Sequence, residues 1–247
     1  MDIIKFVTQI AGKKAWSPLI PLSDVSPTAW FKSDAGLYTD AAKTTPAVND
    51  DSLIYTWDNQ ATGDGDLIQA TEAKRPLLKT VNGKKYIRLD GSDDFMKCIT
   101  TAARNIMTIF IVAKKNSAPI TTGQFLFSFP SNNAGVYSKS TDAGVGFAWY
   151  EPLADLGGNC ENLSVVCLKF NGVDSLSTYV DNGTVVTTNP NDEFDDTAYW
   201  IIGARYGGSS LWGDWDIAEI LYYPSALSDA DRLKVKAYLQ ARWTNPT

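Results

Sequence analysis

The chain has 247 residues, a length that fits one large all-β domain or two small ones. Hydrophobic residues make up 44% of it, enough for a sizeable core, and the formal net charge of -6 without a basic patch or tail speaks against a nucleic-acid partner. The sequence has no histidine, which excludes Ser-His-Asp and Cys-His catalysis and removes the most common metal ligand.

Residues 1–26 differ in character from the rest, with Pro18, Pro21 and scattered apolar residues. We interpret them as an N-terminal arm that docks on a neighbour or on its own domain; a first strand of the fold is an equal alternative. Asp2 and Lys5 interrupt the only early apolar run, so no signal peptide is predicted. No stretch approaches the about 18 apolar residues of a membrane span. We therefore expect synthesis in a cytoplasm, no membrane insertion, and exit by another route, such as release within a virus particle.

From Ser26 onward, short segments rich in β-branched and aromatic residues alternate with turns of Gly, Asn, Asp and Pro, a pattern typical of strands. Asn182 and Gly183 predict a type I′ hairpin turn, and residues 106–114, which are apolar on both faces, predict a central strand. The eleven predicted strands are 53–57, 84–90, 95–99, 106–114, 124–129, 145–150, 163–170, 176–181, 184–188, 199–203 and 216–223.

One helix is predicted near the C-terminus, and it begins after Ser228. Asp231 follows three residues later, which is the spacing of a capping box. The pattern of strands followed by one helix predicts an all-β fold for residues 27–247, a two-sheet antiparallel jelly-roll sandwich with one C-terminal α-helix. The apolar face expected to pack on the sandwich consists of Leu233, Val235, Ala237, Tyr238 and Trp243.

The chain has three cysteines, Cys98, Cys160 and Cys167. An odd number argues against a disulfide framework. Cys167 lies in an apolar strand-like run, and we expect it to be a buried thiol, because free cysteine packs as a small hydrophobic residue.

Several segments resemble, in order and spacing, the laminin-G-like, concanavalin A-like lectin/glucanase domains of bacterial surface proteins and phage structural proteins. They include AWFKSDAGL (29–37), NGKKYIRLDGSDDFM (82–96), IIGAR (201–205) and the stretch 215–243. The resemblance covers residues 27 to 243. It implies two curved antiparallel sheets but no single function, because members bind glycans, bind proteins or decorate a surface.

Glycanases of the wider fold carry a Glu-x-Asp-x-x-Glu pattern on one strand. In this sequence Asp214, Asp216 and Glu219 have a different spacing. We therefore expect that the chain is not an enzyme and has no catalytic residues.

Two charged residues stand inside apolar strands. By alternation, Glu219 shares a face with Ile217 and Leu221, and Arg88 points opposite to its apolar neighbours. An unpaired buried charge is costly. We therefore expect an Arg88–Glu219 ion pair between neighbouring strands. A catalytic Glu219 is the alternative, although a glycosidase needs a second carboxylate across the bond.

Acidic clusters occur at 64–66, 91–95 and 191–196. Calcium takes six to eight oxygen ligands, which loop Asp and Asn residues supply. None of the clusters matches an EF-hand loop, and solvated turn residues are the ordinary interpretation. No cofactor is expected except for this calcium hypothesis, whose candidate ligands are Asp64, Asp66, Asp93 and Asp94.

Two loops, FAWYEPLADLGGN (147–159) and RYGGSSLWGDWD (205–216), combine aromatic residues, acids and a Gly pair. Sugars stack on Trp and Tyr, their hydroxyls bind to acids and backbone groups, and Gly lets the backbone approach a ligand. We expect Trp200 and Trp215 to lie in the core. The candidate ligand-binding residues are Tyr150, Tyr206, Trp212 and Asp214.

Together these features predict a non-catalytic recognition or decoration module on the surface of a phage virion, in the capsid or the tail. It would bind host-surface glycans weakly, with avidity from many copies, and contact neighbouring virion proteins through residues 1–26. Two alternatives remain. One is a purely structural virion protein that binds only neighbouring subunits, and the other is a glycan hydrolase of the same fold.

Overall fold

The structure is a computed structural model, and it describes residues 25–99, 106–116, 123–129, 135–138, 144–148, 154–172, 176–181, 186–188 and 199–244. Seventeen strands and one α-helix, α1 (Asp229–Leu239), lie in these ranges. The first nine strands are β1 (Ala29–Lys32), β2 (Leu37–Tyr38), β3 (Thr56–Trp57), β4 (Leu67–Ile68), β5 (Leu77–Val81), β6 (Lys84–Asp90), β7 (Met96–Ile99), β8 (Met107–Lys115) and β9 (Gln124–Ser128). The others are β10 (Gly135–Ser138), β11 (Gly144–Ala148), β12 (Ala154–Asn159), β13 (Ser164–Phe170), β14 (Leu176–Val180), β15 (Val186–Thr188), β16 (Tyr199–Ile202) and β17 (Asp214–Tyr223).

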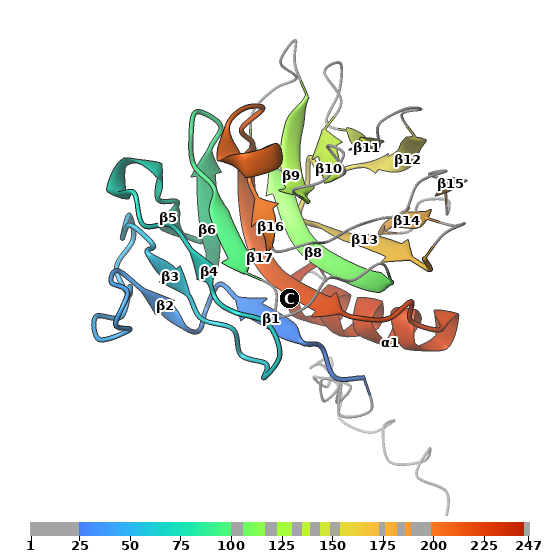
Figure 1. The fold of residues 1–247 in the computed structure, drawn as a ribbon, viewed down its shortest axis with the longest axis horizontal. Coiled ribbons are helices and arrows are strands. Elements are labelled where there is room, and N and C mark those ends of the chain that lie inside the picture. The colour runs from blue at the N-terminus through green and yellow to red at the C-terminus, as the bar shows by residue number, and fades with distance from the viewer. Residues whose placement is uncertain are drawn as a thin grey trace, which may run out of the picture.

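The strands form two antiparallel sheets, with α1 against one of them (Figure 1). The eight-stranded sheet has the order β15-β14-β13-β8-β17-β6-β5, and β1 also pairs with β17. The nine-stranded sheet has the order β12-β11-β10-β9-β16-β7-β4-β3-β2. This arrangement confirms the predicted all-β, two-sheet sandwich with one C-terminal helix.

All eleven predicted strands are present, with bounds that shift by up to a few residues. β8 lies between β13 and β17, and every residue in it except Lys114 is buried, as expected of a central strand. β14 and β15 pair as the predicted hairpin, while its turn residues Asn182 and Gly183 lie outside the described residues. The strands that the sequence did not predict are β1, β2, β4, β5, β10 and β12.

Two hydrophobic clusters hold the layers together. The larger cluster fills the space between the sheets and contains Trp57, Trp200 and Trp215, which are all fully buried. The smaller cluster joins the outer face of the eight-stranded sheet to α1. The expectation that Trp200 and Trp215 are core residues is therefore confirmed.

The three cysteines are all buried and free. Burial raises the pKa of the Cys160 thiol to about 12 and raises the pKa of Cys167 further. Cys167 is thus a buried, protonated thiol at neutral pH, as the sequence predicted.

The helix begins as predicted, because Ser228 Oγ accepts a hydrogen bond of 3.1 Å from the backbone N–H of Asp231. Its apolar face was predicted only in part. Val235, Tyr238 and Trp243 are buried, but Leu233 is 52% exposed and Ala237 is also exposed. At about 100° per residue, both positions fall outside the stripe that Val235 and Tyr238 define.

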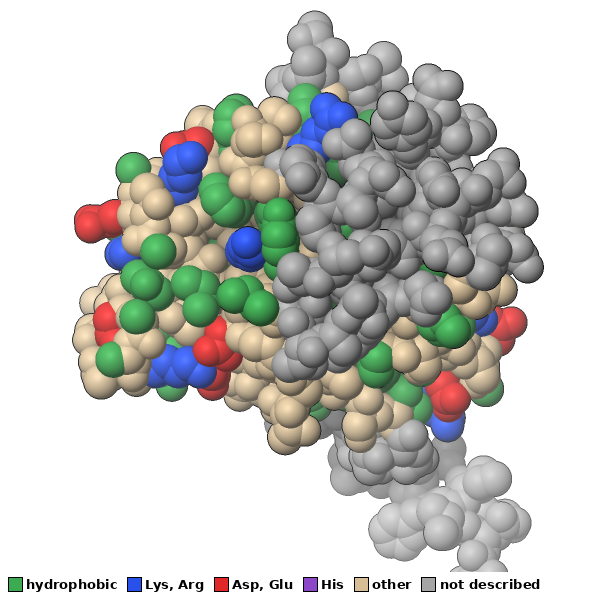
Figure 2. Space-filling view, viewed as in Figure 1, with side chains coloured by type: hydrophobic (Ala, Val, Ile, Leu, Met, Phe, Trp, Pro, Cys, Tyr) green, Lys and Arg blue, Asp and Glu red, His purple; other side chains and the backbone are tan. Residues whose placement is uncertain are grey.

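Residues 1–24, most of the predicted N-terminal arm, lie outside the described residues, so the boundary at residue 26 stays a prediction. No helix in the described part of the chain combines the length and the apolar character needed to cross a membrane. On the face drawn in Figure 2, acidic, basic and hydrophobic side chains are mixed over the coloured residues.

Candidate functional site

Glu219 is completely buried, and donors surround its carboxylate. Its Oε1 accepts from Trp30 Nε1 at 2.6 Å and from the Tyr238 hydroxyl at 3.1 Å, and its Oε2 accepts from Trp243 Nε1 at 2.5 Å. Arg242 Nε lies 3.0 Å from Oε2 as an ion-pair partner, without the angle of a hydrogen bond. These partners lie in β1 and in residues 238–243 of the C-terminal segment. The Glu219 carboxylate therefore links β1 and the C-terminal segment to β17.

The predicted Arg88–Glu219 ion pair is wrong. Arg88 instead binds Asp216 in a bidentate arrangement, with both hydrogen bonds at 2.7 Å. β17 has a register shift between Ile217 and Glu219, a β-bulge that gives Ala218 and Glu219 the same helix-facing side. Strict alternation does not hold across this bulge, so Glu219 shares a face with Leu221 but not with Ile217.

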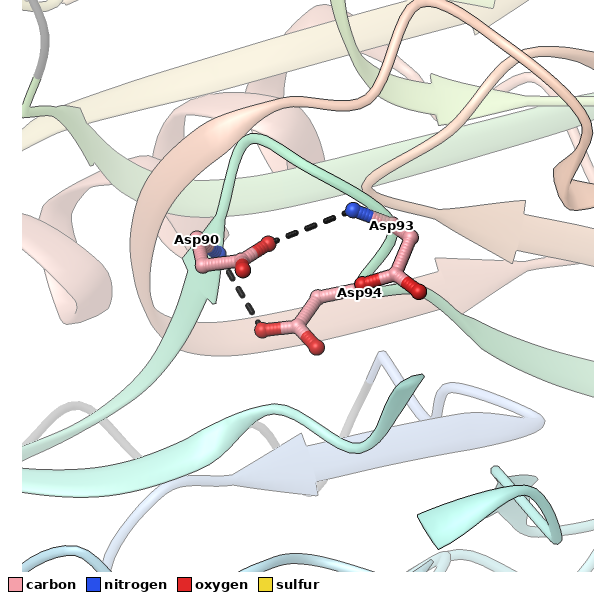
Figure 3. Close-up of side chains that lie close together, drawn as sticks. All are labelled: Asp90, Asp93 and Asp94. Atoms are coloured by element: carbon pink, nitrogen blue, oxygen red, sulfur yellow. Dashed lines mark hydrogen bonds between the residues drawn. The ribbon is translucent and has the colours of Figure 1, made fainter. Parts of the chain in front are cut away.

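Three carboxylates gather in the turn that joins β6 to β7 (Figure 3). One carboxylate oxygen from each of Asp90, Asp93 and Asp94 lies within 4.8 Å of the other two. Among the described residues this is the one group of three acidic or other metal-binding side chains that lie so close together. Asp90 Oδ1 accepts from the backbone N–H groups of Ser92 (2.8 Å) and Asp93 (3.4 Å), and Asp94 Oδ2 accepts from the backbone N–H of Asp90 (3.1 Å). These bonds fix the turn with its acids close together.

Asp94 is the most perturbed acid of this group. Burial, followed by the charges of Asp90 and Asp93, raises the pKa of its carboxyl to about 7, against the opposing hydrogen bond from the Asp90 N–H. Asp94 is thus partly protonated near neutral pH, while Asp90 and Asp93 reach solvent.

The loop between β16 and β17 packs directly on this turn. A Cβ at Gly208 would lie 2.5 Å from Cζ of the Phe95 ring, and a Cβ at Gly203 would lie 3.1 Å from the carbonyl oxygen of Asp94. Both glycines have positive φ, 70° and 87°, so side chains are disfavoured there for two reasons. Gly207 and Gly208 therefore both allow the chain to reverse, and Gly208 also allows the loop to pack against the turn.

The four predicted ligand-binding residues differ in where the structure places them. Trp212 is half-buried, and its indole N–H donates to the Gly208 carbonyl at 3.3 Å. Asp214 begins β17 opposite Asp90, and Tyr206 begins a short 3-10 helix, Tyr206–Gly208. Tyr150 lies outside the described residues.

The four predicted calcium ligands do not form one group. Asp93 and Asp94 lie together, but Asp64 accepts from the Thr28 hydroxyl at 3.1 Å, and Asp66 forms an ion pair with Lys43. The third member of the cluster, Asp90, was missed. Its position before Gly91, in the segment LDGSDD, is a signal for a turn in which an Asp side chain binds the following N–H groups.

Comparison with known proteins shows the fold alone. No protein-family model matches the chain, and no curated protein matches it in sequence. A Trypanosoma rangeli sialidase, solved in complex with 2,3-difluoro-KDN, is similar at 11% identity and a TM-score of 0.57 over 88% of this chain and 33% of the sialidase. The chain thus spans about a third of the sialidase chain.

Two further structures share the architecture. Domain 4 of AbnA, an extracellular GH43 arabinanase of Geobacillus stearothermophilus solved with arabinotriose, is 13% identical with a TM-score of 0.50, covering 86% of this chain and 98% of the domain. The binding domain of botulinum neurotoxin serotype D is 12% identical with a TM-score of 0.52, covering 79% and 54%. These three structures show no link to a phage or to a laminin-G domain.

The expectation that the chain is not an enzyme is corrected by these structures. The same fold occurs in a sialidase, including its complexes with sialic acid and with a covalent intermediate. The absence of one acid pattern from one strand therefore does not exclude activity in a sandwich of this kind.

Proposed function

We propose that this chain binds carbohydrate on the surface formed by the loop 203–213 and the turn 90–95. The observation that carries the proposal is the contact between these segments, which lie more than a hundred residues apart in sequence. Gly208 packs on Phe95. Directly after the loop, Asp214 lies opposite Asp90 where β17 pairs with β6. The loop and the turn are thus held against each other on one part of the molecule.

The chemistry of this surface suits a sugar. Exposed or half-exposed carboxylates accept hydrogen bonds from hydroxyl groups, and the half-buried Trp212 in the loop offers an apolar edge. The fold similarity supports the same proposal, because the AbnA domain was solved with arabinotriose and the sialidase with sialic acid.

A glycan array probed with a multivalent form of the chain tests this proposal. Wild type is expected to bind at least one glycan class, and Tyr206→Ala and Trp212→Ala are expected to lose that binding at least tenfold. Trp212→Phe is the matched control, because it keeps an aromatic ring but removes the hydrogen bond to Gly208 together with part of the ring surface. A blank array from folded, multivalent protein would overturn the proposal.

Carbohydrate hydrolysis is the second candidate function, and Asp94 is the observation that favours it. Retaining glycosidases use one protonated and one ionised carboxyl group about 5–5.5 Å apart. Asp94, with a pKa of about 7, lies with Asp90 and Asp93 in a group whose carboxylate oxygens are within 4.8 Å of one another, somewhat closer than that separation. Sugar release from an array-positive glycan that disappears in Asp94→Asn, with binding retained, would establish hydrolysis. Release that persists in Asp94→Asn would exclude this acid.

We also propose where such binding operates. The resemblance to laminin-G-like phage proteins supports a place on the virion surface, in the capsid or tail, with attachment to neighbouring virion proteins through residues 1–26. Many copies would convert weak binding of host-surface glycans into firm attachment. Deletion of residues 1–26 should then abolish incorporation into particles and leave glycan binding unchanged. Incorporation without the arm would contradict this attachment.

A further inference from the structure

A second concave site lies away from the loop 203–213, next to the turn between β1 and β2. It is a pocket of about 180 Å³. Its walls come from the β1–β2 turn, from residues 46–48, and from Lys85 on β6. No residue of the turn 90–95 or of the loop 203–213 lines it, so it is distinct from the surface proposed above.

Local hydrogen bonds hold the walls in place. The backbone N–H of Ala47 donates to the Leu37 carbonyl at 2.8 Å, and the Ser33 hydroxyl donates to the Lys85 carbonyl at 2.6 Å. Gly36 has a φ of 69° where the chain reverses into β2. The pocket is therefore built into the β framework.

Charged side chains give the pocket a clear polarity. Asp34 on its wall is neutralised by Arg242, whose Nη2 donates to both carboxylate oxygens at 2.8 and 2.7 Å. Lys85 has no carboxylate partner within 4 Å among the described residues. Of the two charged residues that line the pocket, Asp34 is therefore already paired, whereas Lys85 has no such partner in the described part of the chain.

The pocket also offers hydrogen-bond acceptors and apolar surface. Each Asp34 oxygen keeps lone-pair capacity beyond the bond from Arg242 and can accept from a ligand hydroxyl. Leu37, Pro46 and Val48 supply apolar wall, and Val48 is 62% exposed. A cavity of about 150 Å³ holds a benzene molecule. The volume thus fits about one six-membered ring.

We infer that this pocket binds one acidic monosaccharide unit, a pyranose ring that carries a carboxylate. Lys85 would pair with the carboxylate, Asp34 would accept from ring hydroxyls, and the apolar wall would cover the C–H face of the ring. The inference does not rest on the proposed function, because it uses other residues on another part of the surface.

Amide chemical-shift titration of the full chain tests the inference, with glucuronate, glucose and acetate as probes. Glucuronate is expected to shift the amides of residues 34–38, 47–48 and 85. Glucose, which has a hydroxymethyl group in place of the carboxylate, and acetate, which lacks the ring, are each expected to bind at least tenfold more weakly. Lys85→Gln should weaken glucuronate binding at least tenfold, whereas Lys114→Gln, the same change at an exposed lysine outside the pocket, should not.

Three results would overturn the inference. They are an absence of shifts at the pocket, equal affinity for glucose or acetate and glucuronate, and unchanged binding in Lys85→Gln. The titration is repeated in Trp212→Ala, where the pocket should respond as in wild type. A failure at the pocket and a failure of the loop surface are therefore separate outcomes.

Discussion

At the residue scale, two acids in this chain play opposite parts. Glu219 is buried and has partners on both oxygens, whereas Asp94 is buried beside two other acids. The partners of Glu219 offset the cost of burying its charge, whereas the neighbouring acids oppose the ionisation of Asp94. From the sequence, Glu219 was identified as a charge inside an apolar strand and Asp94 as a candidate calcium ligand. The sequence could not assign their partners, because the bulge in β17 and the contact between loop and turn are non-local.

Glu219→Gln is expected to destabilise the protein by about 3–5 kcal/mol, the usual cost of breaking a buried ion pair. The amide presents an N–H group to donors that now bind a carboxylate, and Arg242 loses its buried partner. Urea unfolding measures the change. Glu161→Gln, the same substitution at an exposed position, is the control and should alter the free energy of unfolding by less than about 0.5 kcal/mol. If Glu219→Gln lowers the free energy of unfolding by less than about 1 kcal/mol, Glu219 does not hold β1 and the C-terminal segment against β17.

Asp94 predicts a pH dependence of stability. Its folded pKa of about 7 lies above the unfolded value of about 4, so the folded state binds more protons between these values. The free energy of unfolding should therefore fall as the pH rises from about 4 to 7, by on the order of 2–4 kcal/mol from this group. Asp94→Asn should remove that part of the slope in urea unfolding at pH 5 and pH 8. An unchanged difference between the two pH values would show that Asp94 does not titrate in this range.

Calcium is a second means of neutralising the same three acids. Carboxylate oxygens are its preferred ligands, and backbone groups or water would complete the coordination. Addition of calcium chloride at pH 8 should raise the thermal midpoint of wild type, and the rise should disappear in Asp93→Asn. Sodium chloride at matched ionic strength controls for screening. An equal response to both salts would exclude a specific ion.

At the element scale, most strands were predictable and their partners were not. Alternation and flanking turn residues predicted the long strands β6, β8 and β17. β2, β3 and β4 have only two residues each, too few to show alternation, and only β3 lay within a predicted segment. The buried face of α1 was predicted only in part, because periodicity gives a stripe without stating which side the sheet covers.

Two leucines of the C-terminal segment test how α1 docks. Leu239 is fully buried in the cluster against the eight-stranded sheet, whereas Leu233 on the same helix is 52% exposed. Leu239→Ala should cost about 2–5 kcal/mol, and Leu233→Ala should stay within about 0.5 kcal/mol of wild type. Equal costs in chemical denaturation would contradict the observed orientation of the helix.

At the scale of the whole molecule, the C-terminal segment closes the fold beside β1 (Figure 1). Arg242 contacts Asp34 at the pocket and Glu219 in the interior, so one side chain links both. The loop 203–213 likewise packs against the turn 90–95, which is distant in sequence. The loop and the turn were each predicted from the sequence as candidates for binding, the loop for sugar and the turn for calcium. Only the folded chain brings them together.

The most direct test of the central claim asks whether loop and turn act as one carbohydrate site. Affinities for an array-positive glycan are measured for wild type, Trp212→Ala, Asp93→Asn and the double variant. One shared site predicts a loss in each single variant and a coupling energy above about 0.5 kcal/mol in the double-mutant cycle. Unchanged affinity in Asp93→Asn would show that the turn does not contact the ligand of the loop, and losses that simply add would show that the two side chains act on the ligand independently.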